Sequence, residues 1–314
     1  MTRHFQRVTV LGAGTMGHGI AQICAMAALD TVLYDIDLGA VDTGLQLIGK
    51  DLDAAISLGQ LTEQRRDEVL DRIQRSSDLG FAVKGAQLII EAAPESMDIK
   101  RGLFRLLEQR VGEDTIFATN TSSLSITELA VGMDHPARFL GIHFCNPVHE
   151  MKLVEIVCGE GTSDATRAMV VEFVEAIGKH PILVRDSPGF ATSRLGMALC
   201  LEAIRMVEAG VTSPEDIDKA MMLGYGHPVG PLRLADLVGL DAQLHAAKYL
   251  HEALGSETFR PPELLEQMVA EGKLGKKSGM GFYSWNEDGG SEDRSSEEDS
   301  SEDGTLEDGE SDEN

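Results

Sequence analysis

Short apolar runs alternate with stretches of helical periodicity from the start of the chain. A run at residues 8–11 is followed by apolar positions at helical spacing, Ile20, Ile23 and Ala27, and then by a β-rich run at residues 31–34. This order predicts a strand, a turn, a helix and a second strand.

The alternation continues beyond residue 40. The predicted helices are residues 40–58 and 63–75, and the predicted strands are 86–90, 115–118, 139–143, 153–157 and 181–184. Strands that alternate with helices favour a mostly parallel sheet covered by helices on both faces. We therefore predict a doubly wound α/β domain over residues 1–185.

The pattern changes at Pro188 and Gly189, which mark a break in regular structure. Beyond them strand signals nearly vanish, and residues 194–209 have the periodicity of a long amphipathic helix. Ser213 followed by Pro214 is typical of a helix start. These features predict an all-α C-terminal domain at residues 186–285.

Acidic residues dominate the end of the chain. The formal net charge is −25, and residues 287–314 alone hold 14 acidic residues and one Arg. A segment with so few apolar residues cannot offset the entropy of ordering, so residues 286–314 are predicted to be a disordered acidic tail. The negative charge argues against nucleic acid and anionic membranes as partners.

The rest of the composition indicates an intracellular protein. The chain contains no apolar run of about 18 residues, which a membrane-spanning helix needs, and its N-terminus lacks a signal-peptide pattern. The cysteines are scattered, which favours free thiols in a reducing compartment over a disulfide or zinc framework. We expect a cytoplasmic location and no bound metal. The four cysteines are Cys24, Cys145, Cys158 and Cys200.

The turn after the first strand matches G-x-G-x-x-G. Gly12, Gly14 and Gly17 carry the motif, Met16 lies within it, and Asp35 ends the next strand. A glycine loop between a strand and a helix, with an acidic residue at this distance, predicts a Rossmann-type dinucleotide site. No basic residue lies between Ile36 and Asp42, so a 2′-phosphate would meet only negative charge, which favours NAD over NADP.

His143 lies at the end of an apolar strand and is a candidate acid/base, because imidazole titrates near neutral pH. Glu155 lies within another apolar run, and a buried carboxylate needs a partner. His143 is the natural partner, either as a catalytic pair or as a plain structural hydrogen bond. Such a pair could take the hydroxyl proton of a substrate while its carbon gives a hydride to NAD. Residues 120–123 follow another strand and could contact ligands or form a turn before the next helix.

Together these motifs resemble the L-3-hydroxyacyl-CoA dehydrogenase family, including the bacterial 3-hydroxybutyryl-CoA dehydrogenases. The resemblance covers roughly residues 5–285. The matching segments are 12–21, 91–95 with Lys100, 120–123, 143–148, 151–155, 186–190, 230–231, 236, 239–241 and 279–283.

The resemblance implies reversible NAD-dependent oxidation of an L-3-hydroxyacyl-CoA in fatty acid metabolism, such as β-oxidation, and a homodimer formed through the helical domain. His143 would be the base and Glu155 its orienting carboxylate. The remaining implied contacts are Ser122 and Asn146 for the substrate, and Glu95, Lys100 and Lys277 for NAD.

The chain departs from the family at Ser193, where members usually carry an Asn that positions substrate, and at Cys145, where Phe is common. The hairpin that meets CoA in the family also matches weakly. Two alternatives therefore stay open. One is a dehydrogenase of a free hydroxy acid, of the gulonate or carnitine type, and the other is a non-catalytic relative such as the lens crystallins of this superfamily.

Overall fold

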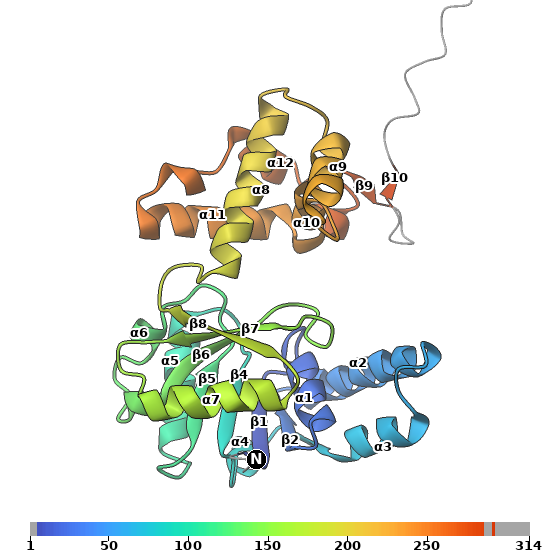
Figure 1. Cartoon of the computed structure of the whole chain (residues 1–314). Helices are drawn as coiled ribbons and strands as arrows, with labels where there is room; N and C mark the ends of the chain where they lie inside the picture. Colours follow the sequence, from blue (N-terminus) through green and yellow to red (C-terminus); the bar gives the residue numbers. More distant parts are fainter. Residues whose placement is uncertain (1–4, 286–290, 293–314) are drawn as a thin grey trace, which may run out of the picture. The chain divides into compact units, whose positions relative to one another are not determined.

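The computed structural model describes residues 5–285 and 291–292. These residues form two compact units that divide after Arg194 (Figure 1). The predicted boundary at residue 185 falls earlier, in the segment before helix α8 (Thr192–Glu208).

An eight-stranded sheet forms the centre of the first unit. Its spatial order is β3-β2-β1-β4-β5-β6-β7-β8, and every neighbouring pair is parallel except β6 and β7. The strands are β1 (Arg7–Leu11), β2 (Asp30–Tyr34), β3 (Ile73–Ser76), β4 (Leu88–Glu91), β5 (Ile116–Thr119), β6 (Phe139–Phe144), β7 (Leu153–Cys158) and β8 (His180–Arg185).

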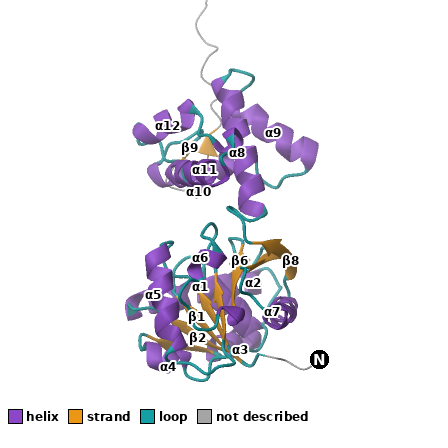
Figure 2. Ribbon diagram, turned by 90° about the vertical axis from the view of Figure 1, so that its left-hand side faces the viewer, coloured by secondary structure: helices purple, strands orange, loops and turns teal. Residues whose placement is uncertain are grey.

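Helices cover both faces of this sheet (Figure 2). Alternate strand residues enter two separate cores: Leu88 and Ile90 face one, whereas Ile89 faces the other. This two-sided burial explains why the strands were continuous apolar runs. The helices of the unit are α1 (Gly17–Met26), α2 (Leu38–Ser57), α3 (Glu63–Asp71), α4 (Leu79–Val83), α5 (Met97–Glu108), α6 (Ile126–Leu129), the 3-10 turn η1 (Pro136–Arg138) and α7 (Asp164–Ala176).

The predicted helix at residues 63–75 is wrong at its end, because α3 stops at Asp71 and residues 73–76 form strand β3. Gln74 and Arg75 are exposed, so the segment has little apolar pattern. Its backbone pairs in parallel with β2 at the edge of the sheet, and this tertiary pairing decides its conformation. Helices α4, α5 and α7 were not predicted.

The order in which strands are added to the sheet reverses at β1: β2 and β3 lie on one side of it, and β4 and the strands that follow lie on the other. Ligands of open α/β sheets bind at such a switch point, beyond the carboxyl ends of the strands. Hydrogen bonds continue past the strand ends here, from the Ala92 amide to the Leu11 carbonyl and from the Asn120 amide to the Glu91 carbonyl. The fold therefore fixes the loops after β1, β4 and β5 side by side.

The second unit is built from helices around its own apolar core. Ser213 caps α9 by accepting from the Asp216 amide, with Pro214 at the first helical position as predicted. The elements are α8, α9 (Pro214–Tyr225), α10 (Pro231–Val238), α11 (Leu240–Leu254), η2 (Glu257–Phe259), α12 (Glu263–Ala270), η3 (Lys276–Ser278), β9 (Ser284–Trp285) and β10 (Ser291–Glu292).

Two buried carboxylates organise this core. Asp218 accepts from the Leu232 and Arg233 amides and from the Tyr283 hydroxyl, and Asp236 accepts from the Trp285 ring nitrogen. Most of the predicted acidic tail lies outside the described residues. Its Ser291–Glu292 segment is described, and it pairs with β9 instead of being irregular.

Candidate active site

The glycine loop after β1 has the shape of a phosphate cradle. Gly12 has φ +103°, and a Cβ there would lie 2.5 Å from the Ala92 carbonyl oxygen. A Cβ on Gly17 would lie 1.7 Å from the Gly12 carbonyl oxygen, so α1 can approach the strand only because this residue is glycine. A Cβ on Gly14 would meet nothing within 4 Å, which leaves its backbone open to a ligand. These features fit a pyrophosphate at the start of α1.

Asp35 follows β2 and holds this loop in place. Its carboxylate accepts hydrogen bonds from the Ala13 amide at 2.9 Å and from the Asp37 amide at 3.2 Å. Asp35 also lines a cavity of this unit. Asp35 thus orders the glycine loop, and its predicted contact with an adenosine ribose remains a prediction.

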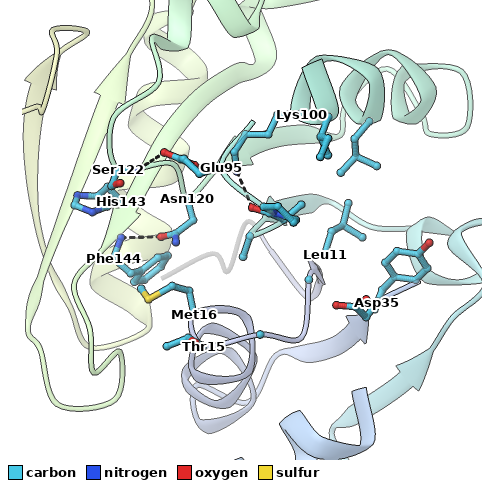
Figure 3. A pocket seen from close by; sticks show the side chains of 18 of the residues that line it. Leu11, Thr15, Met16, Asp35, Glu95, Lys100, Asn120, Ser122, His143 and Phe144 are labelled. Atoms are coloured by element: carbon cyan, nitrogen blue, oxygen red, sulfur yellow. Dashed lines mark hydrogen bonds and ion pairs between the residues drawn. The ribbon is translucent and has the colours of Figure 1, made fainter. Parts of the chain in front are cut away.

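A cavity of about 840 Å³ opens over the carboxyl ends of β1, β4, β5 and β6 (Figure 3). Its size is within the usual range for small-molecule sites. Most of the predicted site residues lie on its wall, namely Gly12, Gly14, Met16, Asp35, Glu95, Lys100, Ser122, His143 and Asn146. One continuous cavity therefore joins the glycine loop to the candidate base.

A buried ion pair that was not predicted from the sequence lies at this wall, which Lys100 itself lines. Lys100 Nζ lies 2.6 Å from Glu91 Oε1, and the two residues are 1% and 0% exposed. Burial raises the pKa of the Glu91 carboxyl, and the charge and hydrogen bond of Lys100 act in the opposite direction. Thr119 and the Ala93 amide also donate to Glu91. The sequence signal that could have revealed the pair is Glu91, a carboxylate at the end of an apolar strand.

Glu95 connects this pair to the loop after β5. Its Oε2 lies 3.4 Å from Lys100 Nζ, and its Oε1 accepts from the Thr121 hydroxyl, the Ser122 amide and the Ser123 hydroxyl. Glu95 therefore sets the position of Ser122 on the cavity wall (Figure 3).

The loop at residues 120–123 forms a turn as well as a cavity wall. Thr121 Oγ1 accepts from the Ser123 and Leu124 amides, whereas the cap of α6 is Ser125. Asn120 lines the cavity, and its side-chain oxygen accepts from the Phe144 amide at 3.0 Å. This bond ties the end of β5 to the end of β6.

His143 and Glu155 face each other across the antiparallel pair of β6 and β7. The distance from His143 Nδ1 to Glu155 Oε2 is 2.6 Å. Glu155 is fully buried, and His143 is 9% exposed, on the cavity wall. The structure therefore brings together the two residues that the sequence singled out.

Residues at the start of α8 complete the surroundings of Glu155. Its Oε1 accepts from the Ala191 and Thr192 amides, and its Oε2 accepts from the Thr192 hydroxyl. Burial raises the pKa of Glu155, but the hydrogen bonds from His143, Thr192 and these amides outweigh it and lower the pKa to about 2. Glu155 is therefore a fixed negative charge behind the imidazole at neutral pH.

The four cysteines were predicted to be free thiols. All four thiols are free; Cys24 and Cys200 are buried, whereas Cys145 and Cys158 are only half-buried. Cys145 lines the cavity beside His143, and burial raises the pKa of its thiol, with a further rise from the charge of Glu155.

Comparison with known proteins assigns this architecture to a family. The model of the NAD binding domain of 3-hydroxyacyl-CoA dehydrogenase matches residues 7–187, and the model of the C-terminal domain of the same enzyme matches residues 189–285. The chain belongs to the 3-hydroxyacyl-CoA dehydrogenase family. The predicted family, the NAD cofactor and the α/β domain followed by a helical domain are thereby confirmed.

Similar proteins cover almost the whole chain. A probable 3-hydroxybutyryl-CoA dehydrogenase of Deinococcus radiodurans is 45% identical over 88% of this chain and 99% of its own length. The crystal structure of (S)-3-hydroxybutyryl-CoA dehydrogenase from Ralstonia eutropha has a TM-score of 0.86 and 42% identity, over 90% of this chain and 99% of that one. A diketoreductase structure has a TM-score of 0.77 and 32% identity, over 91% and 100% of the two chains.

The two binding residues Ser193 and Lys277, which the 3-hydroxyacyl-CoA dehydrogenase resemblance implied, lie off the cavity wall. Ser193 is half-buried in the first turn of α8, next to Thr192. Lys277 belongs to the second unit, where its ammonium forms an ion pair with Asp241. The predicted roles of both in binding remain predictions. None of the helices in the described residues is long and apolar enough to cross a membrane.

Proposed function

We propose that this member of the family catalyses reversible NAD-dependent oxidation of an L-3-hydroxyacyl-CoA to the 3-oxoacyl-CoA, with His143 as the acid/base. One observation supports this proposal above the others. His143, hydrogen-bonded to the buried Glu155, lines the same cavity as the glycine loop and Asp35. A proton acceptor and a dinucleotide site that share one cavity are what hydride transfer from a hydroxyl-bearing carbon requires.

The hydrogen bond between His143 and Glu155 determines which imidazole nitrogen exchanges a proton with the substrate. Glu155 is ionised, so it accepts a hydrogen bond and His143 Nδ1 is the donor. The proton on Nδ1 leaves Nε2 as the nitrogen that can accept a proton from a substrate hydroxyl. Once His143 is protonated, the charge of Glu155 stabilises the imidazolium. In the reverse direction the same imidazolium protonates the oxygen that forms at C3.

The other wall residues hold substrate and cofactor in this proposal. Bound NAD supplies the hydride acceptor. Ser122, fixed by Glu95, donates to the reacting oxygen, and Asn146 contacts the substrate. Asp35 accepts from the ribose hydroxyls, while Glu95 and Lys100 contact NAD.

We further propose a short 3-hydroxyacyl-CoA, such as 3-hydroxybutyryl-CoA, as the substrate, with a role in fatty acid metabolism such as β-oxidation in the cytoplasm. The names of the relatives from Deinococcus and Ralstonia support this choice. The similarity to a diketoreductase supports the alternative of a substrate without CoA, because a related chain of the same fold acts on dicarbonyl compounds according to its description.

A homodimer formed through the second unit is also proposed. Large exposed apolar side chains commonly mark an interaction surface. Six such side chains lie on α9 and α10, namely Met222, Leu223, Tyr225, Leu234, Leu237 and Val238. Sedimentation of the purified protein tests this proposal, and a monomer at micromolar concentration would contradict it.

The deciding experiment follows NADH absorbance with acetoacetyl-CoA and with free acetoacetate as parallel substrates. Turnover of the thioester at a much higher kcat/KM supports the proposal. Turnover of acetoacetate alone would favour the free-acid alternative, and Ser193→Asn is then the first variant to compare. If NADH binds but neither substrate reacts, the activity proposal fails while the dinucleotide site remains.

A further inference from the structure

A buried lysine lies behind the loop that joins β6 to β7. Lys179 precedes β8 and is 7% exposed. Its ammonium donates to three main-chain carbonyls, those of Val148 at 2.6 Å, Met151 at 2.7 Å and His149 at 3.3 Å. An ammonium has three N–H donors, so this cluster of carbonyls uses its full capacity. Nothing in the proposed reaction uses this lysine directly.

The same loop packs against the dinucleotide helix. Val148 is 3% exposed, and a Cβ added to Gly19 of α1 would lie 2.9 Å from the Val148 Cβ. The loop therefore lies directly on the first turn of α1, while three of its carbonyls accept hydrogen bonds from Lys179. Removal of the ammonium would leave these three carbonyls without this hydrogen-bond donor, and the loss matters most at the buried Val148 carbonyl.

The beginning of this loop forms part of the cavity. Cys145 and Asn146 line the wall next to His143, whereas Asp35 lies at the other end of the cavity. Hydride transfer requires the nicotinamide close to the base, so the end at His143 is the nicotinamide end; this step rests on the proposed function.

We infer that Lys179 is a positioning residue, which holds the loop at residues 145–152 against α1 and so keeps Cys145 and Asn146 in place at the nicotinamide end of the cavity. It acts through the loop and touches neither substrate nor cofactor. Its loss is expected to disturb the nicotinamide end and to spare the adenosine end, which the glycine loop and Asp35 hold.

Two ligands distinguish an effect at the nicotinamide end from an effect at the adenosine end. ADP-ribose contains every part of NADH except the nicotinamide. Kd is measured for NADH by fluorescence and for ADP-ribose by calorimetry, in the wild type and in Lys179→Met. The Met variant is expected to bind NADH about tenfold more weakly, which is about 1.4 kcal/mol, with the Kd of ADP-ribose within about twofold of wild type.

Two further variants complete the test. Lys179→Gln keeps two N–H donors, so its NADH affinity should lie between those of wild type and Lys179→Met, and it decides the question if the Met variant does not fold. Lys84→Met makes the same change at an exposed position of the same unit and should match wild type. An equal loss for both ligands, or no loss for either, would overturn the inference. Failure of the proposed function would instead appear as absent turnover in the wild type, which leaves this binding comparison valid.

Discussion

Lys100 and Glu91 form an ion pair of 2.6 Å at a place where both side chains are at most 1% exposed. The pair joins α5 to the end of β4, and through Glu95 it reaches the loop that contains Ser122. Two ions so deeply buried are each other's main compensation for lost hydration. We therefore expect the loss of one of the two charges to lower the stability of the folded chain more directly than the catalytic rate.

We expect Lys100→Met to lower the free energy of unfolding by about 3–5 kcal/mol, because it leaves the Glu91 carboxylate buried without its cation. The double variant Glu91→Leu/Lys100→Met should recover part of this loss, since no unpaired charge remains. Urea denaturation measures both. Lys84→Met is the control, with an expected change within about 0.5 kcal/mol. A Lys100→Met protein as stable as the control would refute the prediction.

Removal of the base tests the His143–Glu155 pair. We expect His143→Gln to lower kcat by about 10²–10⁴ while NADH still binds, since the glycine loop is unchanged. Glu155→Gln should lower kcat as well, but the double variant should be no worse than His143→Gln, because the carboxylate acts through the imidazole. Steady-state kinetics of the three variants give the result, with exposed His135→Gln as control. Additive losses would contradict the pairing.

The pH dependence of stability should report Glu155. Its pKa is about 2 in the folded chain against an ordinary 4.5, so between these values the unfolded chain binds more protons. The contribution of Glu155 to the free energy of unfolding is then present above pH 4.5 and is lost as pH falls toward 2. This contribution is on the order of 3 kcal/mol. Glu155→Gln should flatten the acid limb of the unfolding free energy, and exposed Glu160→Gln should not. An unchanged slope in Glu155→Gln would count against the assigned pKa shift.

Much of the fold was predictable because both faces of the sheet are buried. This burial makes strands such as β4 and β6 nearly continuous apolar runs that are easy to recognise. β3 was not recognised, since an edge strand with exposed Gln74 and Arg75 owes its conformation to pairing with β2. Such pairing is a tertiary effect that a four-residue pattern does not contain.

The candidate site was predictable where an isolated charge in an apolar run demanded a partner. Glu155 satisfied that condition and led to His143. Glu91 offered the same signal and was overlooked, whereas Lys179 and Thr192 could not be found this way. Lys179 binds main-chain carbonyls, and main-chain groups occur at every position, so they leave no mark in the sequence.

Cofactor preference provides the last test and depends on the charge of Asp35. Its carboxylate accepts from the Ala13 and Asp37 amides, so Asp35→Ala would disturb the loop as well as the charge. Asp35→Asn keeps an acceptor oxygen but removes the charge that repels a 2′-phosphate. The ratio of kcat/KM for NAD to that for NADP should therefore fall about tenfold or more, which corresponds to about 1.4 kcal/mol. Asp30→Asn, at the exposed start of the same strand, is the matched control and should leave the ratio unchanged. Because Asp37 remains nearby, NADP should still be the weaker cofactor, and a ratio unaffected by Asp35→Asn would show that discrimination lies elsewhere.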